Sequence, residues 1–227
     1  MNTATELFDC RKAYASTLED IAARDPRLVV VVNDSVGSSN LGRFQELHPD
    51  QIVNVGIAEQ DQVGIAAGLE NGGRVPVVSC AGSFLSARAM EQIKIDAAYS
   101  ERHIVLCAQS PGLAYGQLGA THHSCEDLAW MRVIPNMTVI APADPLETAQ
   151  ALRWAVEDHD GPVYIRVSRM KVPVVHDDGY RFEPGRATVL REGSDAAVFA
   201  TGVVVHRALA AAEALADEGL GVRVVSV

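Results

Sequence analysis

The 227-residue sequence lacks several features that would fix its environment. It has no run of basic residues, and its 29 Asp and Glu outnumber its 19 Lys and Arg. Nucleic acid and anionic membrane are therefore poor partners. No apolar stretch approaches the ~20 residues that a membrane-spanning helix needs. Residues 1–9 lack the basic region and apolar stretch of a secretory signal. We therefore expect a cytoplasmic protein without nucleic-acid or membrane partners.

The cysteines are few and contain no CxxC pair. Three of the four lie in or beside apolar segments, which indicates free thiols in a reducing compartment. His122, His123 and Cys125 stand close together in the sequence. Neighbouring side chains point apart, however, and no second ligand pair exists, so we expect no metal ligands on this chain.

What the sequence does contain is a regular alternation of apolar strands and helices. Strands are predicted at residues 28–32, 51–55, 75–80, 104–109, 137–141 and 163–167. Helices are predicted at residues 13–23, 61–69, 85–99, 125–131 and 145–157. Because such alternation forms βαβ units with right-handed crossovers, the pattern predicts an α/β fold, a parallel sheet flanked by helices.

A second and shorter alternation follows a segment interrupted by Pro, Gly and Asp. We expect a first domain over residues 1–170, a linker over residues 171–185 and the start of a second α/β domain over residues 186–227. The second domain is expected to be incomplete, because about 40 residues are too few for an independent core.

Glu59 stands at a predicted strand-to-helix junction, in the segment Gly56-Ile57-Ala58-Glu59-Gln60. Such junctions are where open α/β folds bind ligands. The apolar helix that follows suggests that the carboxylate is buried, and a buried carboxylate needs a partner. A glutamate stabilised only by the dipole of its helix is the alternative.

This motif resembles the signature of the pyrimidine-binding domain of thiamine diphosphate enzymes in the transketolase family, and the similarity extends over residues 29–167. The resemblance implies that Glu59 hydrogen-bonds the N1' nitrogen of the cofactor's aminopyrimidine, favouring the imino tautomer that takes the proton from C2 of the thiazolium. It further implies that Phe84 stacks on the pyrimidine and that Ile57 and Arg88 line the cofactor site. Core packing of Phe84 and a solvent-facing Arg88 are the alternatives.

The glycine-rich segment 116–123 resembles the family's substrate loop. His122 takes the place of the family's substrate-facing histidine, which implies a catalytic role in orienting substrate oxygens. Leu118 stands where the family has an Asp that contacts a sugar hydroxyl. Because Leu118 cannot accept a hydrogen bond, we expect recognition of the acceptor sugar to differ from that of ordinary transketolase.

Three further positions align with family residues that contact phosphate: Ser38, Ser110 and Arg169. An arginine fork suits phosphate geometry, so we hypothesise that Arg169 and Ser38 bind the terminal phosphate of a sugar. A solvated, unengaged Arg169 is the alternative.

One more absence bears on how the cofactor is held. The family binds the diphosphate through Mg²⁺ with a Gly-Asp-Gly motif followed by an Asn, and this sequence contains neither that motif nor a P-loop. The resemblance therefore implies that thiamine diphosphate is shared with a larger partner subunit, which carries the motif and binds Mg²⁺. A two-fold heterotetramer is the expected assembly.

The implied function is that of the small subunit of a split transketolase, which transfers a two-carbon ketol unit between sugar phosphates. Two alternatives stay within thiamine chemistry: a deoxyxylulose phosphate synthase-like subunit and a 2-oxo-acid dehydrogenase beta-type subunit. A third is a non-catalytic assembly module with the same fold.

Overall fold

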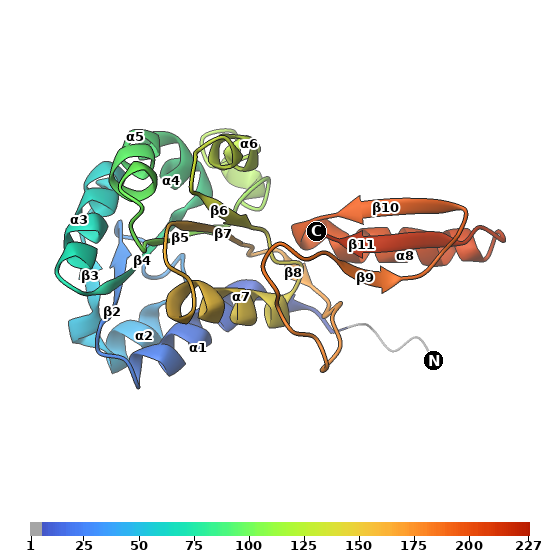
Figure 1. Cartoon of the computed structure of the whole chain (residues 1–227), viewed down its shortest axis with the longest axis horizontal. Coiled ribbons are helices and arrows are strands. Elements are labelled where there is room, and N and C mark those ends of the chain that lie inside the picture. The colour runs from blue at the N-terminus through green and yellow to red at the C-terminus, as the bar shows by residue number, and fades with distance from the viewer. Residues whose placement is uncertain (1–5) are drawn as a thin grey trace.

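The computed structural model describes residues 6–227, so residues 1–5 of the predicted first domain lie outside the described part of the chain. The chain forms two lobes that lie side by side along its long axis (Figure 1). The larger lobe is built on a six-stranded sheet, and the smaller lobe on a three-stranded sheet. A further two-stranded ribbon pairs the two ends of the larger lobe.

All strands of the larger sheet run parallel, in the order β3-β2-β4-β5-β7-β6. They are β2 (Leu28–Val32), β3 (Ile52–Asn54), β4 (Val75–Ala81), β5 (Val105–Gln109), β6 (Thr138–Ile140) and β7 (Val163–Val167). The central strands β2, β4 and β5 are buried along their whole length, as expected for apolar strands covered on both faces. The predicted α/β fold class is therefore confirmed.

Helices cover both faces of this sheet (Figure 1). One face is covered by α1 (Cys10–Ala22), α2 (Gly42–Leu47) and α7 (Pro145–Glu157). The other is covered by α3 (Glu59–Asn71), α4 (Gly82–Arg88), α5 (Met90–Gln92), the π-helical turn η2 (Ile93–Tyr99) and α6 (Asp127–Arg132). Short 3₁₀ turns are η1 (Pro49–Gln51), η3 (Gly116–Leu118) and η4 (Gly202–Val204). Each face has its own apolar core.

The structure corrects two details of the predicted elements. The single helix expected over residues 85–99 is divided at Ala89, whose backbone leaves the helical region before α5 and η2 continue. Two short strands were not predicted: β1 (Phe8–Asp9) and β8 (Lys171–Val172) pair antiparallel. The segment expected to be a linker thus begins with a strand that is bonded to the larger lobe.

The smaller lobe contains β9 (Thr188–Arg191), β10 (Ala196–Ala200) and β11 (Val222–Ser226), with α8 (Val205–Ala216) packed on the sheet. Strands β10 and β11 are parallel, which fits the predicted start of a second α/β domain. Strand β9 runs antiparallel to β11 and was not predicted, because its four residues carry no clear apolar pattern.

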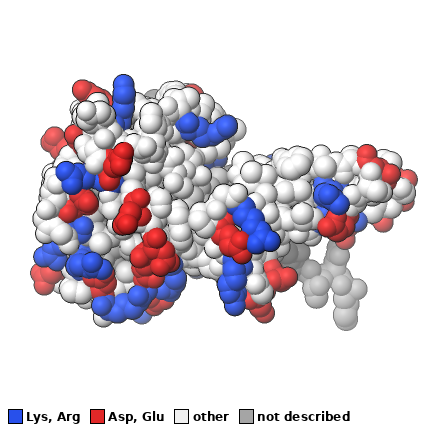
Figure 2. All heavy atoms as spheres, in the orientation of Figure 1, with Lys and Arg blue, Asp and Glu red and all other residues white. Residues whose placement is uncertain are grey.

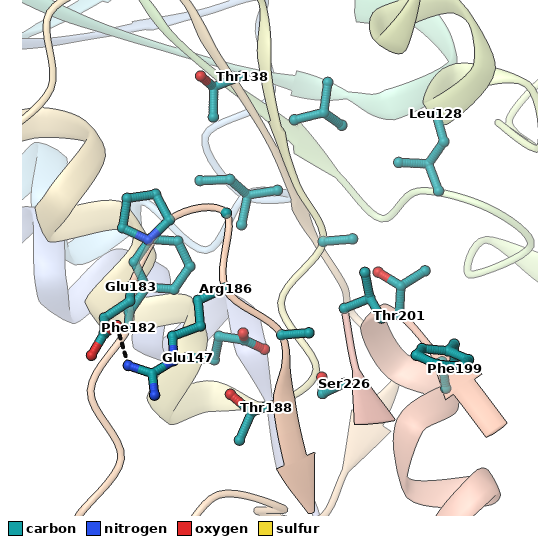
Figure 3. A pocket seen from close by; sticks show the side chains of 18 of the residues that line it. Leu128, Thr138, Glu147, Phe182, Glu183, Arg186, Thr188, Phe199, Thr201 and Ser226 are labelled. Carbon is teal, nitrogen blue, oxygen red and sulfur yellow. Dashed lines mark hydrogen bonds and ion pairs between the residues drawn. The ribbon is translucent and has the colours of Figure 1, made fainter. Parts of the chain in front are cut away.

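A cavity of about 610 Å³ lies between the two lobes, walled by β6 on one side and by β9, β10 and β11 on the other (Figure 3). The only interaction drawn across its lining is the exposed ion pair between Arg186 and Glu183, at 2.6 Å. The carboxylate of Glu147 is already engaged by the Ala143 N–H and the Tyr180 hydroxyl. Both acidic side chains that line this cavity, Glu147 and Glu183, are therefore partnered.

Charged side chains of both signs are interspersed over the larger lobe, on the face shown in Figure 2. No helix within residues 6–227 combines the length and apolarity needed to cross a membrane. All four cysteines are free thiols; Cys10, Cys80 and Cys107 are buried, whereas Cys125 is exposed. Burial raises the pKa of Cys10 to about 11, so this thiol is protonated at neutral pH.

Asp144 joins the segment after β7 to the larger lobe. Its carboxylate caps α7 by accepting the Glu147 N–H at 2.8 Å, and it also accepts the N–H groups of Val175 and His176 and the His176 Nδ1 at 2.9 to 3.0 Å. Burial alone would raise the pKa of Asp144, but the hydrogen bonds from His176 and the backbone outweigh it and lower this pKa. The residues expected to form a linker are thus bonded directly to α7.

Replacing Asp144 by Asn removes the negative charge that these donors share. We expect Asp144→Asn to lower the free energy of unfolding by ~2–3 kcal/mol at neutral pH, measured by urea denaturation. Because the folded-state pKa lies below its ordinary value of 3.8, the contribution is complete above that pH. It is lost as pH falls through the folded-state pKa, so the difference between the variants should shrink in acid. The exposed Asp178→Asn is the matched control, and an equal effect of both changes contradicts the assignment.

Candidate functional site

The predicted site residues lie where the parallel strands end. Glu59 follows β3, Phe84 follows β4, His122 lies in the loop after β5, and Arg169 follows β7. The carboxyl ends of parallel strands share one edge of the sheet, which is the usual ligand-binding edge of an open α/β fold. Side chains far apart in the sequence are thereby gathered at this edge.

Glu59 is the first residue of α3 and is only 4% exposed. The turn that brings it there needs a positive φ of 72° at Gly56, which glycine adopts without strain. Its Oε1 atom accepts a hydrogen bond from Asn33 Nδ2 at 2.9 Å and forms an ion pair with Arg88 Nη1 at 3.0 Å. The helix N-terminus adds favourable electrostatics for the anion. The buried carboxylate thus has the partners that its desolvation requires.

Arg88 connects this carboxylate to an aromatic ring. Its Cζ atom lies 4.1 Å from the centroid of the Phe84 ring, so the guanidinium stacks on Phe84 while it donates to Glu59. The Arg88 side chain is 51% exposed, and the contribution of this ion pair to stability is therefore reduced by solvent screening. Arg88 thus contacts both Glu59 and Phe84, and its role at a cofactor site stays a prediction.

His122 lies between two aromatic rings. Its ring is 5.1 Å from that of Phe84 and 5.4 Å from that of Tyr115, tilted by 65° and 70° respectively, which are edge-to-face arrangements. The Thr121 hydroxyl lies 2.9 Å from His122 Nδ1. With Nδ1 engaged, Nε2 is the imidazole nitrogen left to face a ligand.

The loop that carries His122 is fastened at its neck. Gly112 and Ser124 exchange two backbone hydrogen bonds, and a Cβ atom added at Gly82 would lie 2.9 Å from Ser124 Oγ and 3.3 Å from Pro111 Cα. Only glycine permits this close approach at position 82. The contact holds the loop after β5 against the start of α4, and Phe84 lies on that helix.

Two buried hydroxyl groups flank this contact. Ser83 Oγ and Ser110 Oγ have no hydrogen-bond partner among the described residues. Ser110 also has a positive φ of 56°, which is uncommon for a residue other than glycine. Buried unpartnered hydroxyls and local backbone strain both occur preferentially where ligands bind.

Behind the loop, Asp127 is completely buried and accepts hydrogen bonds from the Tyr164 hydroxyl at 2.9 Å and from Arg166 Nε at 3.0 Å. Arg166 in turn lies close to Gly112, with Nη2 3.3 Å from the position of an added Cβ. This buried cluster therefore supports the base of the loop without belonging to the site itself.

Not every predicted residue joins this constellation. Ser38 is exposed. Its hydroxyl donates to the Ser35 carbonyl, and its own carbonyl accepts a hydrogen bond from Arg11 on α1. Ile57 is 79% exposed, and Leu118 is 48% exposed on the loop. Among the described residues, the Ser38 hydroxyl makes no hydrogen bond to Glu59 or His122, and the Ile57 and Leu118 side chains are turned largely to solvent.

Two residues of the site escaped the sequence analysis. Asn33 follows β2 and bonds Glu59, and Tyr115 touches both His122 and Arg169, whose Cζ lies 4.8 Å from the Tyr115 ring centroid. The only signal for Asn33 was its position at the carboxyl end of a buried strand. The only signal for Tyr115 was an aromatic residue beside a glycine-rich loop.

Among residues 6–227 no three His, Cys, Asp or Glu side chains are grouped so that they could hold a metal ion. His123, which was considered as a ligand with His122 and Cys125, instead lies with Nε2 3.2 Å from the Gly116 carbonyl.

The larger lobe is a pyrimidine-binding domain. A sequence profile described as "Transketolase, pyrimidine binding domain" matches residues 6–175, and one described as "Transketolase, C-terminal domain" matches residues 185–227. The chain is 40% identical over 225 residues to a subunit of apulose-4-phosphate transketolase from Phocaeicola vulgatus, covering 99% of this chain and 72% of that one. It is 36% identical to a 6-deoxy-6-sulfo-D-fructose transketolase subunit of a Clostridium species, covering 96% and 67%.

A solved structure of a split-gene transketolase, described as an inactive beta4 tetramer, is similar at 40% identity and a TM-score of 0.86, covering 96% of this chain and 70% of that one. The chain belongs to the transketolase family. It spans roughly two thirds to three quarters of the length of these relatives, between 67% and 72%.

Family membership implies the use of thiamine diphosphate. The described residues fit the aminopyrimidine part of this cofactor. The buried Glu59 carboxyl group can hydrogen-bond a nitrogen of the pyrimidine ring, and the half-buried Phe84 offers an aromatic face on which the flat ring can stack. The buried Ser83 and Ser110 hydroxyls have no partner among the described residues, so their hydrogen-bonding capacity is unused.

The close contact at Gly82 yields a test of how the substrate loop is held. We expect Gly82→Ala to lower the free energy of unfolding by ~1–3 kcal/mol, because the new methyl group displaces Ser124 and Pro111. Chemical denaturation measures this loss. Gly68→Ala is the matched control, since nothing lies within 4 Å of a Cβ there and Gly68 is inside α3. It should be neutral or stabilising, and a similar loss in both variants contradicts the close-contact argument.

Proposed function

We propose that this chain is the small subunit of a thiamine diphosphate-dependent split transketolase, which transfers a two-carbon ketol unit between sugar phosphates. The observation that carries the proposal is the Glu59 carboxylate, buried at a helix N-terminus beside the face of Phe84. A buried carboxylate is stable only with hydrogen-bond donors around it. One of the donors to Glu59, Arg88, is half exposed, so a ligand that enters from solvent can take its place.

Each residue of the site has a distinct role in this proposal. Glu59 binds the pyrimidine nitrogen and holds a proton there, Asn33 orients the Glu59 carboxylate, and Phe84 supports the ring. The bound cofactor supplies the stabilised carbanion on which ketol transfer depends. His122 orients substrate oxygens through Nε2, because its Nδ1 is engaged by Thr121.

Substrate phosphate would be held at the other end of the site. Arg169 is the proposed phosphate ligand. Ser110, directly after β5, donates its backbone N–H to the Val167 carbonyl at 2.8 Å, two residues before Arg169. Ser38 and Ile57, whose side chains are exposed in the described part of the chain, keep their proposed substrate and cofactor roles only if the assembled enzyme brings them to the ligand. The exposed Leu118 is the proposed reason for an acceptor preference different from that of ordinary transketolase.

The Mg²⁺ and diphosphate half of the site would be supplied by a larger partner subunit with the Gly-Asp-Gly motif, in a two-fold heterotetramer. The names of two relatives, each a subunit of a transketolase, support a partner. Those names also point to sugars outside the common set, apulose 4-phosphate and 6-deoxy-6-sulfo-D-fructose, which supports an unusual substrate. A cytoplasmic location stays a prediction.

Replacement of Glu59 tests the central role. We expect Glu59→Gln, in the enzyme assembled with its larger subunit, to reduce turnover by at least ~10²-fold, because positioned acid–base groups contribute that much. Ketol transfer is measured with the complex, and calorimetry checks that cofactor is still bound. The exposed Glu46→Gln on α2 is the matched control. Full activity of Glu59→Gln contradicts the proposal, and failure of the wild-type complex to bind cofactor favours a non-catalytic assembly module.

Arg88 offers a second test, because its guanidinium makes the two contacts that a pyrimidine ring needs. It lies on the face of Phe84 and donates to Glu59, so it has to move when the ring binds. We expect Arg88→Ala to tighten cofactor binding to the assembled enzyme by about 3- to 10-fold, since that displacement is no longer required. Calorimetric titration measures the dissociation constant, with the exposed Arg43→Ala as control. Weaker binding would identify Arg88 as a cofactor ligand that stays in place.

A further inference from the structure

Tyr115 makes an aromatic contact with His122 and a cation–π contact with Arg169, which are two of the proposed substrate-binding residues. Its ring is 5.4 Å from the His122 ring and 4.8 Å from the Arg169 guanidinium carbon. The ring is only 7% exposed, so its position is set by packing and not by solvent. His122 and Arg169 come from different elements, the loop after β5 and the end of β7, and Tyr115 joins them.

Arg169 is held without being neutralised. Within residues 6–227 no carboxylate lies within ion-pair distance of its guanidinium, and none of its N–H groups has a hydrogen-bond acceptor. A cation–π contact holds a guanidinium against an aromatic ring without using its N–H groups, which stay free to donate hydrogen bonds. The half-buried Arg169 is therefore oriented, charged and ready to bind an anion.

His122 is held in the same manner. Its ring makes edge-to-face contacts with Tyr115 and with Phe84, and Thr121 engages Nδ1. The Tyr115 ring thus fixes both the nitrogen that would face substrate oxygens and the cation that would face substrate phosphate. The separation between these two groups defines how long a bound molecule must be to reach both.

We propose that Tyr115 is a positioning residue that sets the spacing between His122 and Arg169, and thereby the chain length of the phosphorylated substrate. The proposal rests on the proposed function for the nature of the substrate, a sugar phosphate. The aromatic ring carries the effect, because the Tyr115 hydroxyl has no hydrogen-bond partner among the described residues.

The test compares aldose phosphates of three, four and five carbons with the unphosphorylated aldoses of the same length, using the enzyme assembled with its larger subunit. For Tyr115→Ala we expect KM for the preferred aldose phosphate to rise about 10-fold, which is within the range of a cation–π contact. We expect kcat to change less than this KM. The KM for unphosphorylated aldoses should change little. Discrimination among chain lengths should narrow.

Three variants separate positioning from a general structural role. Tyr115→Phe keeps the ring and should behave as the wild type. In an Arg169→Ala background, Tyr115→Ala should add little, because the two residues act through one contact. Tyr99→Ala is the control, since Tyr99 is 80% exposed on η2.

Calorimetric binding of the aldose phosphates gives a second readout that does not require turnover, so the proposal can be judged even if the complex transfers no ketol unit. Absent ketol transfer with intact, Tyr115-dependent phosphate binding would overturn the proposed function and keep this inference. Equal losses for phosphorylated and unphosphorylated aldoses, failure of Tyr115→Phe to restore binding, or an undiminished effect of Tyr115→Ala in the Arg169→Ala background would each overturn the inference.

Discussion

The arrangement of the site depends on one buried charge. The Glu59 carboxylate is 4% exposed at the N-terminus of α3, and within residues 6–227 the side chains of Asn33 and Arg88 donate to it. A carboxylate in this position is stable only while donors surround it. Asn33 is buried beside the sheet and holds the Glu59 carboxylate from a fixed position. Arg88 is half exposed, so its side chain has room to move into solvent. A ligand that approaches from solvent can replace this donor.

The remainder of the larger lobe holds other groups at fixed positions around this carboxylate. The contact of Gly82 with Ser124 fixes the substrate loop on the helix that carries Phe84. The aromatic contacts then run from Phe84 through His122 to Tyr115 and end at Arg169. Groups held by packing in this way are pre-organised, so little ordering remains to be done when a substrate binds. The hydrogen bonds of Asp144 hold the segment that leads to the smaller lobe on the N-terminus of α7.

Much of the fold followed from sequence pattern. The ends of β2, β7 and α7 agree with the predicted residues, because apolar runs mark buried strands and α7 begins at an Asp N-cap followed by Pro. Strand β9 and the β1–β8 pair were missed because they are short and depend on distant partners. In the site, motif resemblance located Glu59, Phe84 and His122, whose roles stay predictions. Asn33 and Tyr115 could not be recognised, because their importance lies in contacts across strands that no local pattern encodes.

The most direct test of the account is a crystal structure of the chain assembled with its larger subunit, thiamine diphosphate and Mg²⁺. The account predicts that the aminopyrimidine lies on Phe84 with a ring nitrogen at hydrogen-bond distance from Glu59, and that Arg88 has left that position. A structure in which cofactor is bound while Glu59 still pairs with Arg88, or in which Glu59 faces bulk solvent, would contradict the central claim.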